Sequence, residues 1–284
     1  MDVSGLKIFV SVVENGSITK AANELHRVPS GVTTRILQLE EALGVSLFLR
    51  EKKRLFVTPK GKLLYEYARR ILDMVSEAEK QMRGKEPAGT FRIGAMESTA
   101  AVRLPKPLAK LHARYPSLEL ALTTGTSRFL YELLIDNRLD AVFIADAGHD
   151  DRIERMPAFD EELVLITPAG HTPIKEPSDI TRGTILVFKD GCSYRHRLIS
   201  WFRTYGLEPA RKVELASYHA IMGGVAAGMG IGVVPIAVLE LLPDRHTLSV
   251  HQCAHPLGKA PTELIWRKGM YQANIFALQE CLRV

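Results

Sequence analysis

The chain has 284 residues, enough for two domains, and its 24% charged and 46% apolar content is that of an ordinary folded protein. No apolar run approaches the roughly 20 residues of a membrane helix, and no basic segment with a long apolar core opens the chain, so we expect neither a membrane partner nor export. The three cysteines are too few and too widely spaced for a disulfide framework or a zinc site, which favours a cytoplasmic location.

The net charge of +5 is concentrated in the first third of the chain. Residues 1–90 hold 15 basic and 11 acidic side chains, whereas residues 91–284 hold 22 and 21. Within residues 50–62, six basic side chains are accompanied by a single acidic one, Glu51. Such a run is often only a solvated surface, but beside a helix with a polar outer face it indicates a surface that binds nucleic acid.

Two short helices are predicted first. Apolar residues recur at helical spacing from Leu6 to Val13, and Gly16 follows them as a stop signal. Ser17 is expected to cap the second helix, over residues 18–26, in which small alanines permit close packing. A short turn then leads to Pro29, which gives the layout of a helix-turn-helix.

Residues 29–44 are the stretch around which this region is organised. As a helix they place four apolar residues on one side, at spacings of four, three and four: Val32, Ile36, Leu39 and Leu43. The remaining faces carry short polar side chains and one arginine, Arg35, which suit the donors and acceptors of a DNA major groove. Alone, a helix of this kind more often belongs to a solvated bundle. The preceding turn and the basic run favour DNA recognition.

A β-hairpin and a long helix are predicted next. The apolar runs at 46–50 and 54–58 are joined by charged residues, which indicates a wing with a basic tip that contacts phosphates. Thr58 and Pro59 then suit the cap and first turn of a helix. Its apolar residues form a heptad seam that we expect to pair with a second copy, packing on the chain's own second domain being the alternative. The seam is Leu64, Ala68, Ile71, Val75, Ala78 and Met82.

A dense set of residues across positions 1–65 matches one known family. It comprises Phe9-Val10, Val12-Val13, Gly16-Ser17, Thr19, Ala21-Ala22, Leu25, Val32, Ile36, Leu39-Glu40, Leu43-Gly44, Leu47-Phe48, Arg50 and Thr58-Pro59-Lys60-Gly61. This pattern resembles the winged helix-turn-helix of LysR-type transcriptional regulators. The resemblance implies a regulator rather than an enzyme, with double-stranded DNA as a partner and no cofactor. It also implies a homodimer formed through the linker helix, or a homotetramer in which two such dimers pair.

One departure from the family pattern affects the predicted DNA contacts. Val28 and Pro29 stand where the family usually has a serine and a glutamine, which commonly cap the recognition helix and read a base. Base reading is therefore expected to shift along the helix. The complete set of expected DNA-binding residues is Ser17, Thr19, Lys20, Arg27, Pro29, Ser30, Gly31, Thr33, Thr34, Arg35, Arg50, Lys52, Lys53 and Arg54.

Residues 91–284 alternate predicted strands and helices, which indicates α/β structure with parallel sheets covered by helices. The length suits two lobes, and the region resembles the periplasmic-binding-protein-like effector domain of the same family. The expected division is a DNA-binding domain at 1–59, a linker helix at 60–84, a hinge at 85–90 and an effector domain at 91–284. Within the effector domain we expect lobe I at about 91–162 and 266–284, and lobe II at about 163–265.

Three loops place hydroxyl groups at predicted helix starts that follow strands: 96–99, 125–127 and 189–195. Ligands of open α/β sheets bind at such positions, although helix capping alone would also explain the hydroxyls. The resemblance implies a small-molecule effector, for which a carboxylate or another anion is the generic expectation. The candidate effector-binding residues are Ser98, Thr99, Thr126, Ser127, Cys192, Ser193, Tyr194, Ser217 and His219, with Arg195 beside them.

Other chemistry is less well supported by the pattern. Cys192 lies near Lys189 and Arg195 at a predicted helix start, a setting that lowers a thiol pKa, but no resolving cysteine accompanies it. The histidines share no metal-ligand spacing, so no metal site is expected. Two rival classes remain: a two-lobed binding protein or enzyme would explain only residues 91–284, and an architectural DNA binder would explain only the first ninety.

Overall fold

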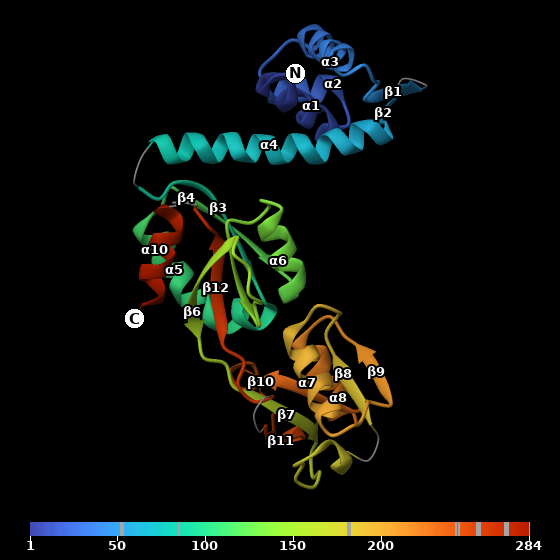
Figure 1. Cartoon of the computed structure of the whole chain (residues 1–284), viewed down its shortest axis with the longest axis vertical. Coiled ribbons are helices and arrows are strands. Elements are labelled where there is room, and N and C mark those ends of the chain that lie inside the picture. Colours follow the sequence, from blue (N-terminus) through green and yellow to red (C-terminus); the bar gives the residue numbers. More distant parts are fainter. Residues whose placement is uncertain are drawn as a thin grey trace. The chain divides into compact units, whose positions relative to one another are not determined.

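The structure is a computed structural model that describes residues 1–51, 54–83, 86–180, 183–241, 243, 245–253, 257–269 and 273–283. The side chains of residues 50, 51, 54, 77 and 80–83 are not part of this description. The chain divides into two compact units, residues 1–85 and 86–284 (Figure 1). In the described part of the chain, no helix has the length and apolar character that spanning a membrane requires.

The first unit is a helical bundle with a wing. Its elements are α1 (Val3–Asn15), α2 (Ile18–Glu24), α3 (Pro29–Leu43), β1 (Phe48–Glu51), β2 (Arg54–Val57) and α4 (Pro59–Arg83). β1 and β2 pair in antiparallel register, Phe48 opposite Val57. The core lies among the three short helices, where Phe9, Ala22 and Val32 are completely buried. The predicted helix-turn-helix and wing are confirmed.

The ends of these helices follow the predicted capping chemistry. The hydroxyl of Ser17 accepts a hydrogen bond from the backbone N–H of Lys20, and Thr58 Oγ1 accepts one of 2.9 Å from the N–H of Gly61. Gly44 ends α3 in the left-handed conformation, with φ of 66°. Val28 precedes α3 without any side-chain cap, as its apolar side chain requires.

The apolar stripe of α3 is shorter than predicted. Val32, Ile36 and Leu39 are buried, but Leu43 is 37% exposed, so the prediction was wrong for the last residue of the stripe. The final turn of α3 extends past the small core formed with α1 and α2.

The seam of α4 is used differently from the prediction. Ala68 is completely buried against the core of the first unit, and Leu64 and Ile71 pack partly on the same core. The first half of the seam therefore faces α1, whereas the prediction assigned all of it to a second copy. Leu63, Tyr67 and Met74 form a separate exposed apolar set on α4.

Lobe I of the second unit is built on a five-stranded sheet with strand order β4-β3-β5-β12-β6. Its strands are β3 (Gly89–Ala95), β4 (Leu118–Thr124), β5 (Ala141–Ala145), β6 (Ile153–Phe159) and β12 (Thr262–Arg267). The helical segments that accompany the sheet are η1 (Thr99–Arg103), α5 (Pro105–Arg114), α6 (Ser127–Ile135) and α10 (Ala273–Leu282). Since β12 belongs to this sheet, the return of the chain into lobe I begins at Thr262 rather than near residue 266.

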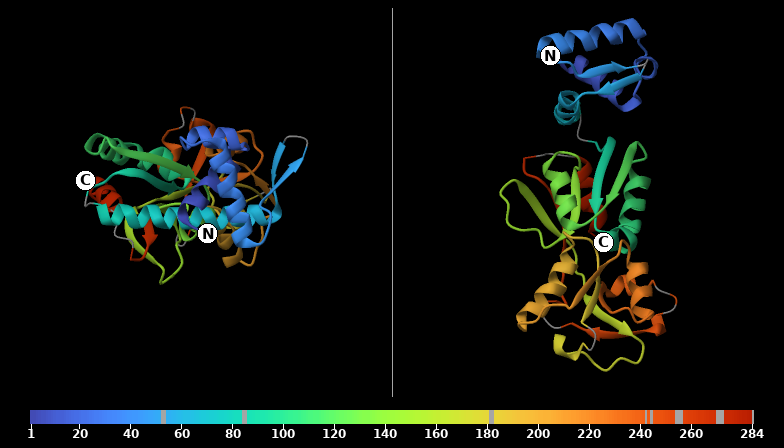
Figure 2. Two further views of the ribbon diagram at one scale, coloured as in Figure 1. Left: turned by 90° about the horizontal axis from the view of Figure 1, so that it is seen from above. Right: turned by 90° about the vertical axis from the view of Figure 1, so that its right-hand side faces the viewer.

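Lobe II has a sheet of strand order β11-β7-β10-β8-β9. Its strands are β7 (Leu163–Pro168), β8 (Thr184–Val187), β9 (Arg211–Glu214), β10 (Ile231–Pro235) and β11 (Leu248–Gln252), and its helical segments are η2 (Pro177–Asp179), α7 (Ser193–Thr204), α8 (Tyr218–Ala226), α9 (Ile236–Leu239) and η3 (Arg245–Thr247). The chain passes between the lobes twice, after β6 and before β12 (Figure 2).

The expectation of wholly parallel sheets was wrong. β3 pairs in parallel with β4 and β5, but β12 pairs antiparallel with β5 and β6. In lobe II, β7 likewise pairs antiparallel with β10 and β11. These antiparallel strands adjoin the two passages between lobes, where the chain enters or leaves a sheet without a crossover helix.

Candidate DNA-binding surface and ligand cavity

The first half of α3 presents a polar surface to solvent. Pro29, Ser30, Gly31 and Thr34 are exposed, and Thr33 is partly exposed. The hydroxyl groups of the two threonines donate hydrogen bonds of 3.0 Å to the carbonyl oxygens of Pro29 and Ser30. Because a hydroxyl has one hydrogen, both threonines offer only lone pairs and methyl groups to a DNA base.

Arg35 is held by a residue that sequence reasoning missed. Its guanidinium forms an ion pair with the carboxylate of Asp2 and donates a 3.0 Å hydrogen bond to Gln38 Oε1. The Asp2 carboxylate also caps α1 by accepting from the N–H of Gly5 at 2.7 Å. This backbone hydrogen bond, followed by the one from Arg35, lowers the pKa of Asp2. Asp2 therefore places a negative charge beside the expected reading surface.

The other expected DNA contacts divide into two groups. Thr19, Lys20 and Arg27 are exposed around α2, whereas Ser17 is partly buried as the cap of that helix. In the wing, Lys52 and Lys53 lie outside the described residues, as do the side chains of Arg50 and Arg54.

The larger cavity of the second unit, about 580 Å³, lies between the two lobes. Four of the predicted effector-binding residues line it: Thr126, Ser127, Cys192 and Tyr194. The remaining lining residues are Met96, Glu97, Thr124, Gly125, Phe129, Phe188, Lys189, Asp190, Ala216 and Tyr218. The loops singled out in the sequence thus meet at one cavity, but the aromatic walls and Glu97 were not among the predicted residues.

The other predicted effector-binding residues surround this cavity or serve the fold. Ser98 and Thr99 are buried, and within the described part of the chain neither hydroxyl makes a hydrogen bond of normal length and angle. Ser217 caps α8 by accepting from the N–H of Ala220 at 3.2 Å. His219 lines neither described cavity. Burial raises the pKa of Glu97, and the backbone N–H of Tyr218 and then the charge of His219 oppose that rise.

A second cavity of about 430 Å³ adjoins the first, and Ser193 and Arg195 line it. Ser127, Asp190 and Cys192 line both cavities. These shared residues belong to a set of contacts that joins the lobes.

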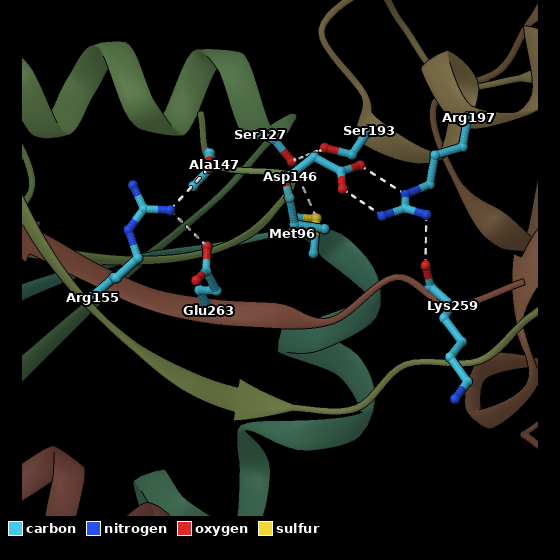
Figure 3. Close-up of polar contacts among 10 residues, drawn as sticks. Met96, Ser127, Asp146, Ala147, Arg155, Ser193, Arg197, Lys259 and Glu263 are labelled. Carbon is cyan, nitrogen blue, oxygen red and sulfur yellow. Dashed lines mark hydrogen bonds and ion pairs between the residues drawn. The ribbon is translucent and has the colours of Figure 1, made fainter. Parts of the chain in front are cut away.

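The centre of those contacts is Ser193 (Figure 3). Its Oγ lies 2.8 Å from Ser127 Oγ and 2.7 Å from the carbonyl oxygen of Ala145, to which it donates because a carbonyl can only accept. Arg197 on α7 pairs with the carboxylate of Asp146, which follows β5 of lobe I. The start of α6 and the end of β5 with the residue after it, all in lobe I, therefore hold the first turns of α7.

Cys192 has a different environment from the one its sequence neighbours indicated. Burial raises the pKa of its thiol, and this outweighs the nearby backbone N–H groups of Arg195 and Tyr194 and the charge of Arg195. The expectation of a lowered pKa was wrong because proximity to basic residues in the sequence does not guarantee solvation. The thiol is therefore poorly suited to act as a thiolate nucleophile.

Comparison with known proteins gives the family. Residues 3–62 match the bacterial regulatory helix-turn-helix protein model of the lysR family, and residues 84–283 match the LysR substrate binding domain. The chain is 39% identical over 95% of its length to the uncharacterized HTH-type transcriptional regulator YusT of Bacillus subtilis (strain 168), of which 91% is covered. It is 35% identical over 99% of its length to the HTH-type transcriptional regulator SoxR of Arthrobacter sp. (strain TE1826), of which 95% is covered.

Among solved structures, full-length CbnR complexed with its target DNA superposes with a TM-score of 0.70 at 24% identity, covering 100% of this chain and 99% of that one. The chain belongs to the LysR family of bacterial transcriptional regulators. It is a DNA-binding transcriptional regulator that carries an effector-binding domain.

Proposed function

We propose that α3 enters the DNA major groove, with Ser30, Thr33, Thr34 and Arg35 meeting base edges. The observation that carries this is the exposure of the first half of α3. Thr19, Lys20 and Arg27 and the basic wing would contact phosphates, which position the protein without reading sequence. CbnR, whose fold is shared, has been seen in complex with its target DNA.

The binding unit in this proposal is a homodimer. Leu63, Tyr67 and Met74 expose an apolar surface on α4 at spacings of four and seven, which fits pairing with the same helix of a second copy. Two copies would present their recognition helices to successive major grooves on one face of the DNA. Pairing of dimers into a tetramer is an extension of the same proposal.

The ligand in this proposal is a small effector bound in the larger interlobe cavity. The two lobes would exchange between different relative arrangements. An effector that contacts both lobes would raise the population of the arrangement that it binds better. The activity is regulation rather than catalysis, and it would take place in the bacterial cytoplasm, where the DNA is.

Fluorescence anisotropy with the DNA upstream of the protein's own gene tests the DNA-binding proposal. Arg35→Ala should weaken binding to the preferred site by about 10- to 100-fold, corresponding to roughly 1–3 kcal/mol for a guanine contact. Arg114→Ala, which removes an exposed arginine of α5 paired with Glu280, should leave the affinity unchanged. An equal loss on all sequences would assign Arg35 to a phosphate, and absence of binding to duplex DNA at low salt would refute the proposal.

A further inference from the structure

The residue before α3 is apolar and exposed where a capping residue is usual. Val28 is 66% exposed, and its side chain makes no cap for the helix. A serine or threonine at this position would stabilise α3 by accepting a hydrogen bond from its first turn. Val28 thus serves neither the core of the first unit nor the end of its own helix. Residues that break a local rule in this way are expected mainly at functional sites.

The next exposed side chains of α3 extend this apolar surface. Pro29 is exposed, and a proline has no N–H to donate. The hydroxyls of Thr33 and Thr34 donate to the carbonyl oxygens of Pro29 and Ser30, each at 3.0 Å, so their hydrogens are already used. Thr34 is exposed and therefore offers DNA a methyl group and the lone pairs of its hydroxyl. The start of α3 is thus richer in apolar groups than in hydrogen-bond donors.

Gly31 leaves this surface open to close approach. It is exposed, and a β-carbon at this position would lie 3.5 Å from Val28 Cγ2, an ordinary van der Waals distance. The valine side chain therefore packs beside the first turn of α3 rather than pointing away from the helix. Because glycine has no side chain, a DNA base edge can come close to the backbone of that turn and meet Val28 there.

The chemistry of the major groove shows which base suits such a surface. Thymine presents a C5 methyl group beside its O4 acceptor, whereas the other bases present only donors and acceptors there. In helix-turn-helix proteins, the N-terminal residues of the recognition helix contact the base edges. The apolar groups of Val28, Pro29 and Thr34 stand at that end of α3. They gain nothing from a donor or an acceptor, but they can bury a thymine methyl group.

We propose that the start of α3 recognises thymine through its methyl group, with Val28, Pro29 and Thr34 as the specificity-determining residues. This rests on the proposed function, because it assumes that α3 enters the major groove. Each methyl group buried between protein and DNA should raise the affinity by about fourfold, which corresponds to about 0.8 kcal/mol. The preferred site then combines thymines, read by apolar contact, with a guanine, read by Arg35.

One DNA sequence made in two chemical forms tests the proposal on the full-length protein. The fragment upstream of the protein's own gene is synthesised either with thymidine triphosphate or with deoxyuridine triphosphate, since uracil pairs as thymine does but lacks the methyl group. Anisotropy is measured with an excess of unlabelled duplex of scrambled sequence, so that only the specific complex is seen. The wild-type protein should bind the thymine form about tenfold or more tightly, because a homodimer makes each contact twice.

Two substitutions locate the contact. Thr34→Ser removes one methyl group and retains the hydroxyl that bonds the carbonyl oxygen of Ser30. Val28→Ser removes the apolar side chain and supplies the missing cap, so it cannot act by loosening α3. Each should reduce the preference for the thymine form by about fourfold or more. The matched control is Thr204→Ser in α7, where an exposed threonine makes the same kind of bond, to the carbonyl oxygen of Ser200 at 3.0 Å. It should leave the preference unchanged.

The outcomes separate this proposal from the proposed function. Equal affinity of the wild-type protein for the two forms, or no complex that resists the competitor, would overturn the proposal. So would an undiminished preference in both Thr34→Ser and Val28→Ser, since the weaker binding of uracil DNA would then come from the altered duplex and not from these side chains. Failure of the wild-type protein to bind either form without competitor would refute the proposed function itself.

Discussion

Asp2 and Arg35 show how one acidic residue can adjust a DNA-binding surface. Arg35 is the charged side chain of the exposed first half of α3, yet its guanidinium is already paired in the free protein. To contact a base, the Arg35 guanidinium must leave the Asp2 carboxylate. Because the ion pair is exposed, it contributes little to the stability of the fold. The pairing keeps Arg35 in place while reducing its attraction to DNA.

We expect Asp2→Asn to raise DNA affinity by about three- to tenfold at low salt, because it removes a negative charge next to the phosphates and frees Arg35. Asparagine caps helices as well as aspartate does, so the melting temperature should change little. Anisotropy titrations at several salt concentrations measure the effect. Unchanged affinity would mean that Arg35 is not used on DNA.

His251 is a second residue whose surroundings fix its protonation state. Its Nδ1 accepts a 3.2 Å hydrogen bond from the N–H of Ile174, and its Nε2 lies 2.9 Å from Thr167 Oγ1. The acceptor role of Nδ1 requires the neutral ring, with the proton on Nε2. Burial, with a smaller contribution from the charge of His171, lowers the pKa of His251 from its ordinary value of 6.5.

A depressed folded-state pKa means that protonation is harder in the folded than in the unfolded chain. The contribution of neutral His251 to the unfolding free energy is fully present above pH 6.5, the pKa of an ordinary histidine in the unfolded chain. It is lost as the pH falls through the lower pKa of the folded state. The melting temperature of the wild-type protein should therefore fall as the pH is lowered from 7.5 to 5.5. The melting temperature of the His251→Gln variant should fall less steeply over that range. His112→Gln, at an exposed position of α5, should keep the wild-type slope, and parallel slopes for all three proteins would contradict the assignment.

At the scale of elements, α4 has two apolar sets with separate uses. Ala68 is buried against the first unit, whereas Tyr67 and Met74 are 54% and 64% exposed. The sequence pattern alone favoured the first set for pairing, because a heptad repeat does not say which surface it meets. The first half of that seam packs on the core of the first unit instead of on a second copy.

We expect Tyr67→Glu combined with Met74→Glu to convert the proposed homodimer to monomers at micromolar concentration, because each copy would place two charges in the proposed apolar interface. Light scattering or sedimentation measures the mass. The melting transition of the first unit should persist, since neither side chain belongs to its core. The control is Glu66→Lys combined with Arg70→Glu, which changes two exposed charges of α4 outside the apolar set. A dimer that survives the double substitution would locate the interface elsewhere.

The success of the sequence predictions also varies by element. Helices with caps, such as α2 after Ser17 and α3 between Pro29 and Gly44, were found because the responsible groups are local. The antiparallel pairing of β12 with β5 and β6 was missed because it depends on where the chain re-enters the sheet of lobe I. In the cavity, hydroxyl-bearing loops were recognised, but Glu97 and the aromatic walls depend on the approach of two lobes that no local pattern encodes.

For the whole second unit, the contacts of Ser193 join one lobe to the other. Ser193→Ala would leave the carbonyl oxygen of Ala145 without the hydroxyl donor and remove the contact with Ser127. We expect a loss of about 1–3 kcal/mol in unfolding free energy, the usual cost of a buried group left unpaired. Urea denaturation measures it.

Ser200→Ala, further along α7, is the matched control and should cost much less. An equal effect of the two substitutions would show that Ser193 contributes no more than any serine of the helix. A substantial difference would identify the start of α7 as the point at which the lobes are held.

Gly191 lies at this same junction, with φ of +84° and its carbonyl oxygen accepting from the N–H of Arg128 at 3.2 Å. A β-carbon here would lie 2.9 Å from the Cβ of Arg128 and 3.0 Å from Thr126 Oγ1. A larger residue at position 191 would therefore push the segment before α7 away from the start of α6. Genetic screens should therefore recover substitutions at this glycine in two kinds of variant. One kind no longer responds to the effector, and the other is active when no effector is added.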